Sequence, residues 1–89
     1  MLGTKFQKKV WNFLKTTPKG SVKTYKEVAI AIKHPKSARA VANACAKNPY
    51  APQIPCHRVI RSDGRLGGYS GKGGIKTKLR LLRSEKVDI

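Results

Sequence analysis

Apolar residues recur at helical spacing at the start of the chain and predict an amphipathic helix. One side of this helix carries Phe6, Val10, Trp11, Phe13 and Leu14. Lysines occupy the other side, so we expect a supporting helix whose apolar side, tryptophan included, lies in the core. Thr4 is a candidate N-cap, and Thr17-Pro18-Lys19-Gly20 ends the pattern because proline and glycine interrupt helices.

A second helix is predicted to begin at Thr24, because Thr24 and Glu27 have the spacing of a capping box. Its apolar side carries Tyr25, Val28, Ala29 and Ile32. His34-Pro35 should end the helix, since the residue before a proline avoids helical geometry. Tyr25 lies at the start, where a phenol serves either as a half-buried anchor or as a hydroxyl presented to a ligand. By itself, we interpret it as an anchor.

A third helix is predicted from Ala38 to Ala46 or Lys47, with Ser37 as its cap. Its inward side should carry Ala38, Val41, Ala42 and Cys45. Its outward side should carry Arg39, Ala40, Asn43, Ala44 and Lys47. Alanines between basic and amide side chains let a helix approach a surface closely, so the two short helices indicate a helix-turn-helix. A plain helical hairpin is the alternative.

The second half of the chain predicts turns, a small wing and a last helix. Asn48 can bond its own backbone and fix a turn, and segments 59–62 and 65–66 flank Asp63-Gly64 as a hairpin. The last helix should point Ile75, Leu79 and Leu82 inward, and Lys76, Lys78, Arg80 and Arg83 mostly outward, before Glu85. We therefore predict one domain over residues 1–89, mainly α with a small β wing, with winged helix-turn-helix-like architecture.

Charge indicates the class of partner. Lysine and arginine number 20 against 4 aspartates and glutamates, a formal net charge of +16. This is more than solubility requires and favours a polyanion, with nucleic acid as the leading candidate. An anionic membrane surface would also accept the charge, but the basic residues are spread along the chain and no apolar run approaches the ~20 residues of a membrane span. We expect no membrane attachment.

Cysteine usage and the N-terminus suggest a reducing compartment. No signal-peptide core is present, so we expect a cytoplasmic protein, nucleoid-associated in a prokaryote or nuclear in a eukaryote, with both cysteines as thiols. The cysteines and histidines lack the paired short spacings of structural zinc sites, and the glycine-rich segment 67–74 lacks phosphate-loop spacing. We expect neither a metal nor a cofactor.

Pro55-Cys56-His57-Arg58-Val59 places a thiol directly before an imidazole. A thiolate is a strong nucleophile, and a nearby histidine favours it near neutral pH. Adjacent residues rarely face each other, so cooperation between Cys56 and His57 requires a turn, a bridging water or a third group. These two residues alone leave catalysis and an incidental pair both open.

Together these motifs resemble the DNA-binding, active-site domain of the O6-alkylguanine-DNA alkyltransferases, a family of direct-reversal DNA repair proteins. The Pro-Cys-His-Arg-Val core is highly specific, and the other matching motifs are spread over almost the whole sequence. They are Thr4 with Phe6-Gln7 and Val10-Trp11, the turn Pro18-Lys19-Gly20, Thr24-Tyr25 with Glu27-Val28-Ala29, Ala38-Arg39-Ala40-Val41, Asn48-Pro49, the stretch from Ile54 to Ile60, Ser62-Asp63-Gly64, Leu66-Gly67-Gly68-Tyr69-Ser70-Gly71 and Leu81-Leu82 with Glu85.

The resemblance implies a protein that binds double-stranded DNA, flips O6-alkylguanine and transfers the alkyl group irreversibly to Cys56, once per molecule. His57 would activate the thiol through water, and Glu85 would orient His57. The Tyr25 hydroxyl would assist departure of guanine, and Asn48 would hold the turn between the recognition helix and the site. We therefore expect a single-turnover cysteine S-methyltransferase acting on methylated DNA.

The resemblance also implies binding through the minor groove, where Ala40 and Ala44 suit a tight fit and Arg39 fills the gap left by the extruded base. Asn43 and Tyr25 would belong to the same DNA-binding surface. The base pocket would be formed by Val59, Gly67, Tyr69 and Ser70. We expect a monomer.

Members of this family usually carry a further N-terminal domain, which this sequence lacks. Either the domain is naturally solitary or the sequence is a piece of a longer protein, and Met1 slightly favours the first. Ala42 stands where glycine is common, and Lys33-His34 replaces a glycine-containing turn. Two other functions are considered. A non-enzymatic alkyltransferase-like lesion binder would have a different residue, often tryptophan, in place of Cys56. A plain winged-helix DNA-binding protein would leave the Cys56-His57 pair unexplained.

Overall fold

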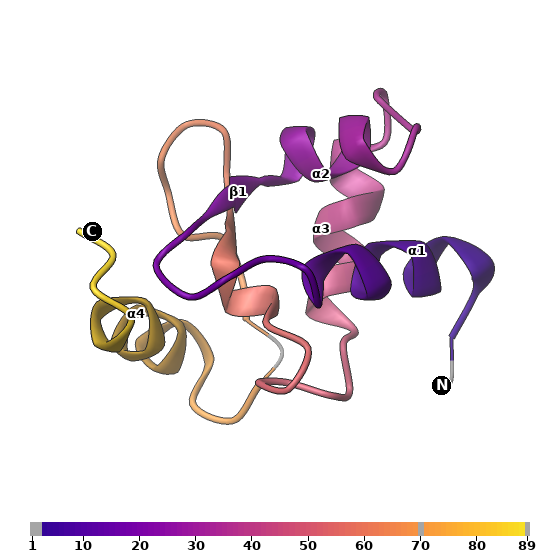
Figure 1. Ribbon diagram of the computed structural model, residues 1–89. Coiled ribbons are helices and arrows are strands. Elements are labelled where there is room, and N and C mark those ends of the chain that lie inside the picture. Colours follow the sequence, from indigo (N-terminus) through magenta and orange to yellow (C-terminus); the bar gives the residue numbers. More distant parts are fainter. Residues whose placement is uncertain (1–2, 70, 89) are drawn as a thin grey trace.

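The protein is mainly helical with one small sheet (Figure 1), which confirms the predicted fold class. This computed structural model describes residues 3–69 and 71–88. Its elements in chain order are α1 (Lys5–Leu14), β1 (Lys23–Thr24), α2 (Tyr25–Ala31), α3 (Ala38–Ala46), the short 3-10 helix η1 (Cys56–Arg58), β2 (Val59–Ile60) and α4 (Gly74–Ser84). Helix α4 lies at the opposite end of the molecule from the start of α1 (Figure 1).

The predicted caps of the first two helices are confirmed. The Thr4 hydroxyl accepts from the backbone N–H of Gln7 at 3.1 Å, and the Gln7 side chain accepts from the Thr4 N–H at 2.9 Å. Thr24 and Glu27 form the same reciprocal pair at 3.0 and 2.9 Å. Because the first N–H groups of a helix lack intrahelical partners, these pairs fix where α1 and α2 begin.

Helix α1 packs against the buried side of α3. Val10, Trp11 and Leu14 are buried, as predicted for the apolar side of α1. The Trp11 indole Nε1 donates to the carbonyl of Ala44 at 2.9 Å, which satisfies the polar atom of a buried tryptophan. The outer side of α3 therefore faces away from α1.

The prediction that His34-Pro35 ends the second helix was wrong in position, because α2 ends at Ala31. Lys33 has a left-handed backbone with φ 67°. Its N–H donates to the carbonyl of Ile30 at 3.0 Å, and the His34 N–H donates to the carbonyl of Ala29 at 2.8 Å. This is a Schellman motif, which stops the helix before the proline can.

Two expectations for α3 were wrong. Ala44 was placed on the outward side but is 1% exposed, whereas Ala42, predicted inward, is partly buried and packs against the core. The side with Val41, Ala44 and Cys45 packs inward because α1 covers it, a contact that α3's own pattern does not encode. The Ser37 side chain also makes no cap hydrogen bond.

The predicted antiparallel wing strands are absent among the described residues. Instead β2 pairs in parallel with β1, with Lys23 opposite Val59 and Thr24 opposite Ile60. The turn at Asp63-Gly64 is confirmed, since the Arg61 N–H donates to the Arg65 carbonyl at 2.9 Å. A partner 36 residues earlier in the chain is invisible to a local strand pattern, which explains the error.

The prediction for α4 was wrong at two positions. Lys78 was placed outward but is 0% exposed, while Ile75 was placed inward and is 55% exposed. Leu82 is buried as predicted. The buried side of α4 thus runs through Lys78 and Leu82, because backbone carbonyls of other segments receive the lysine side chain.

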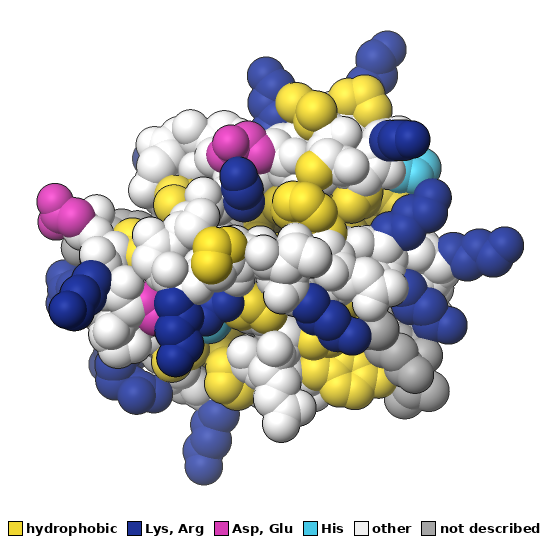
Figure 2. Space-filling view, in the orientation of Figure 1, with side chains coloured by type: hydrophobic (Ala, Val, Ile, Leu, Met, Phe, Trp, Pro, Cys, Tyr) yellow, Lys and Arg dark blue, Asp and Glu magenta, His cyan; other side chains and the backbone are white. Residues whose placement is uncertain are grey.

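Basic side chains are scattered over the visible face of the molecule and project from its margins, with few acidic ones between them (Figure 2). None of the helices within residues 3–69 and 71–88 is long and apolar enough to cross a membrane.

Candidate active site

Cys56 begins η1, one turn before β2, and its side chain is 2% exposed. The turn is closed by the Arg58 N–H, which donates to the Pro55 carbonyl at 3.0 Å. Cys56 lies in the same buried cluster as Tyr25 and Cys45. Burial raises the pKa of Cys45 to about 12, so that thiol remains protonated near neutral pH.

The side chains of His57 and Glu85 contact each other, as the resemblance implies. Nε2 of His57 lies 2.8 Å from Oε2 of Glu85. Hydrogen bonds from Arg58, and then from His57, lower the pKa of Glu85 to about 2, so the carboxylate is ionised and only accepts. We therefore assign the proton of the neutral ring to Nε2.

The tautomer of His57 leaves its other nitrogen basic. Burial lowers the pKa of His57 below its ordinary value, although Glu85 partly offsets this effect, so the ring is neutral near pH 7. Nδ1 is buried and has no hydrogen-bond partner among the described residues. A neutral imidazole with an unprotonated buried nitrogen, in the residue next to a thiol, is suited to accept a proton.

Arg58 completes this group of side chains. Its Nε and Nη2 donate to Oε1 and Oε2 of Glu85, each at 2.8 Å. Its Nη1 donates to the backbone carbonyl of Thr17 at 2.7 Å. Arg58 thus joins η1, the end of α4 and the turn after α1. Sequence reasoning placed Arg58 only within the motif and assigned it no partner.

Asn48 ties the end of α3 to the segment that carries Cys56. Its Nδ2 donates to the carbonyl of Ile54 at 2.9 Å, and its Oδ1 accepts from the backbone N–H of Tyr50 at 2.9 Å. The second bond confirms the predicted local turn. Because the side chain is buried, these bonds fix the path from α3 to the active-site segment.

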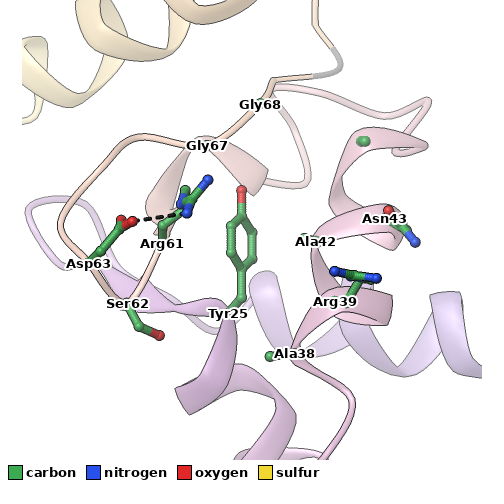
Figure 3. A pocket seen from close by; sticks show the side chains of 11 residues that line it. Tyr25, Ala38, Arg39, Ala42, Asn43, Arg61, Ser62, Asp63, Gly67 and Gly68 are labelled. Carbon is green, nitrogen blue, oxygen red and sulfur yellow. Dashed lines mark ion pairs between the residues drawn. The ribbon is translucent and has the colours of Figure 1, made fainter.

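A cavity of about 670 Å³ opens between α2, α3 and the segment after β2 (Figure 3). It brings together four predicted site residues, Tyr25, Arg39, Asn43 and Gly67. The remaining wall consists of Ala38, Ala42, Ala46, Arg61, Ser62, Asp63 and Gly68. Figure 3 shows the Tyr25 side chain rising between Arg61 on one side and Arg39 on the other. Cys56 and His57 are buried and are not among the residues that line this cavity.

Tyr25 presents a protonated hydroxyl. Burial is the main cause that raises its pKa to about 12. The hydroxyl end of the side chain points toward Gly67 (Figure 3). Gly67 has φ 73°, and a Cβ built there would overlap the Tyr25 hydroxyl. Only glycine therefore fits beside this phenol.

Lys78 holds the segment that forms one side of the cavity. Its Nζ donates to the carbonyls of Val59 at 2.6 Å and Gly68 at 3.1 Å, and also to that of Leu66. The same atom lies 5.8 Å from the centroid of the Tyr25 ring. Burial lowers the pKa of Lys78 to about 8. No signal in the sequence marked this lysine, which looks like any outward helix residue.

The other predicted site residues lie in different surroundings. Ala40 is exposed on α3, whereas Val59 is fully buried in β2. Tyr69 packs edge-on against His57, with ring centroids 6.5 Å apart. Ser70 lies outside the described residues. In the ranges 3–69 and 71–88, no three His, Cys, Asp or Glu side chains are grouped so that they could hold a metal ion.

The family model for 6-O-methylguanine DNA methyltransferase, DNA binding domain, matches residues 5–87. A methylated-DNA--protein-cysteine methyltransferase from Methanosarcina barkeri is 50% identical over 87 residues, covering 98% of this chain and 54% of that protein. The crystal structure of Mycobacterium tuberculosis OGT in complex with DNA superimposes with a TM-score of 0.90 at 48% identity, covering 96% of this chain and 51% of that one.

A third similar protein has nearly the size of this chain. The crystal structure of S. pombe Atl1 in complex with damaged DNA containing O6-carboxymethylguanine gives a TM-score of 0.85 at 31% identity. The match covers 100% of this chain and 82% of Atl1. By contrast, the chain spans only about half the length of the M. barkeri protein and of OGT.

Proposed function

Since the chain belongs to the family of the 6-O-methylguanine DNA methyltransferase DNA-binding domain, we propose that it repairs DNA by moving an alkyl group from O6-alkylguanine to Cys56. The observation that carries this proposal is the state of His57. Its Nε2 is bonded to an ionised Glu85 at 2.8 Å, and its buried Nδ1 is left as an acceptor beside the thiol-bearing residue.

The reaction follows from these groups. Nδ1 of His57 accepts the Cys56 proton, directly or through water, and the thiolate donates an electron pair to the alkyl carbon. A carbon–sulfur bond forms as the bond between that carbon and the guanine oxygen breaks. The leaving guanine keeps the bonding pair, and the protonated Tyr25 hydroxyl supports it as a donor. A thioether is not readily cleaved, so each molecule reacts once.

Duplex DNA is the proposed partner. The net charge of +16 favours phosphate binding, and Arg39 and Asn43 of α3 line the cavity rim with Tyr25. Because Cys56 is 2% exposed, the alkyl carbon can reach sulfur only if the base leaves the stack and enters the protein. In this proposal Ala40 contacts the groove with Arg39, while the buried Ala44 is excluded from the DNA surface.

The test is the intact mass of the protein after mixing with a duplex containing one O6-methylguanine. We expect a gain of one methyl group on Cys56. Cys56→Ser is the control and should show no gain. Absence of a gain in the unaltered protein, at protein and DNA concentrations where binding is saturated, would contradict alkyl transfer.

Lesion binding without transfer is the second candidate, because the chain covers 82% of Atl1, whose structure contains damaged DNA. Under this hypothesis the protein would bind O6-alkylguanine duplexes more tightly than unmodified ones, while its mass stayed unchanged. Binding measured with Cys56→Ser separates recognition of the lesion from the reaction.

A further inference from the structure

We propose that Arg58 is a positioning residue, which fixes the Glu85 carboxylate in one ionised orientation and thereby keeps His57 a neutral base with Nδ1 open to the thiol proton. This inference rests on the proposed function, in which His57 accepts the proton of Cys56. It assigns a task to a side chain that is not among the residues lining the cavity.

Three hydrogen bonds hold the Glu85 carboxylate in a single orientation. Oε1 of Glu85 accepts from Arg58 Nε at 2.8 Å, and Oε2 accepts from both Arg58 Nη2 and His57 Nε2 at 2.8 Å. Rotation of the carboxylate would break the parallel pair with the guanidinium. Because Oε2 is shared, the same pair that holds Glu85 also aims it at His57.

The backbone fixes Arg58 in turn. Its Nη1 donates to the Thr17 carbonyl at 2.7 Å, so the guanidinium is held from the side away from Glu85. The Arg58 and Glu85 side chains are only 12% and 8% exposed, so water competes little for these bonds. Arginine presents donors in a planar fork, whereas a lysine ammonium is a single point and cannot reproduce all three bonds.

Charge gives the second part of the argument. The charged groups near His57 are Lys78 on α4, Glu85 at the end of α4 and Arg58 on η1. The Tyr69 ring, from the segment after β2, packs edge-to-face against the imidazole. Burial is the main cause that lowers the pKa of His57; Glu85 opposes it by favouring the imidazolium, and the charges of Arg58 and Lys78 lower the pKa further. Without Arg58, the full charge of Glu85 would act on His57. The imidazolium would then carry a proton on Nδ1, which could no longer accept one.

NMR of the imidazole nitrogens tests this directly. In the unaltered protein we expect the Nε2–H tautomer and a titration midpoint below that of an exposed histidine. In Arg58→Gln the midpoint should rise by about one pH unit, the scale expected when a neighbouring charge changes. Arg83→Gln is the matched control: it removes an arginine charge from the end of α4 and should leave the midpoint unchanged. An unchanged midpoint in folded Arg58→Gln would overturn the proposal.

Arg58→Lys keeps the inference testable if the glutamine variant does not fold. It retains the charge but not the fork, so we expect a smaller rise of the midpoint, with some Nδ1–H tautomer. A His57 signal identical to that of the unaltered protein would refute the positioning role.

Single-turnover alkyl transfer gives the functional readout. The acid limb of the pH–rate profile should move upward with the His57 midpoint in Arg58→Gln, giving about a tenfold lower rate on that limb for a shift of one unit. If the unaltered protein transfers no alkyl group, the proposed function fails, while the NMR titration still decides the role of Arg58. A uniform loss of rate at every pH, with no shift of the limb, would count against positioning.

Discussion

Replacement of Lys78 by methionine should lower the free energy of unfolding by about 2–4 kcal/mol. Methionine is an unbranched side chain one atom shorter than lysine and donates no hydrogen bond, so the carbonyls of Val59, Leu66 and Gly68 would lose their donor. A buried acceptor without a partner costs about 1–3 kcal/mol. The Val59 carbonyl bond is buried, whereas the other two bonds are partly exposed, so those carbonyls can turn to water. Removing the ammonium recovers part of the loss, because burial disfavours its charge.

Urea unfolding followed by circular dichroism measures this difference. In thermal unfolding the same loss corresponds to a drop of roughly 10–25 °C for a domain of this size. Lys76→Met is the matched control, because it removes an exposed lysine from the same helix and should change stability by less than about 0.5 kcal/mol. If Lys78→Met were as stable as that control, the three carbonyl bonds would contribute nothing and the reasoning would be refuted.

Three further predictions concern single positions. Lys33→Gly should stabilise the protein by about 1 kcal/mol in urea unfolding, because φ 67° strains a side chain but not glycine; equal or lower stability would contradict this. The Glu85 carboxylate, with its pKa lowered to about 2, stabilises the fold above the ordinary glutamate pKa and loses this contribution as pH falls toward 2. Glu85→Gln should therefore flatten acid unfolding between pH 5 and 2, and an unchanged acid profile would contradict that. Gly67→Ala should slow alkyl transfer, because the added Cβ would displace the Tyr25 hydroxyl. Gly64→Ala is the control for backbone strain, because Gly64 has a similar φ but a Cβ there would meet no neighbour. Equal transfer rates in the two variants would contradict the prediction.

Local patterns predicted the features that depend on neighbouring residues. The capping pairs of Thr4 and Thr24 need only a partner three residues away, so their spacing was sufficient. The apolar side of α1 was predicted for the same reason, because five large residues recur on one side. The pairing of His57 with Glu85 came from the resemblance and not from spacing, since 28 residues separate them.

Features that depend on distant backbone were missed. Lys78 looks like an outward residue because no side-chain pattern reveals carbonyls that turn toward it. Ala44 looks equally suited to either side of α3, and its burial follows from Trp11, 33 residues earlier. Arg58 is adjacent to His57 in the motif. Because a buried Glu85 carboxylate needs a positive partner, this arginine was the candidate that the sequence offered.

The short parallel sheet links the two segments that carry Tyr25 and Cys56, the donor and the nucleophile of the proposed reaction. Tyr25 follows β1 directly, and η1 with Cys56 leads directly into β2, while Lys23 pairs with Val59. A slip of this ladder by one residue would displace donor and nucleophile relative to each other and reverse the side on which Val59 points. An insertion or deletion next to either strand would therefore be expected to shift Tyr25 relative to Cys56 and to slow the proposed transfer.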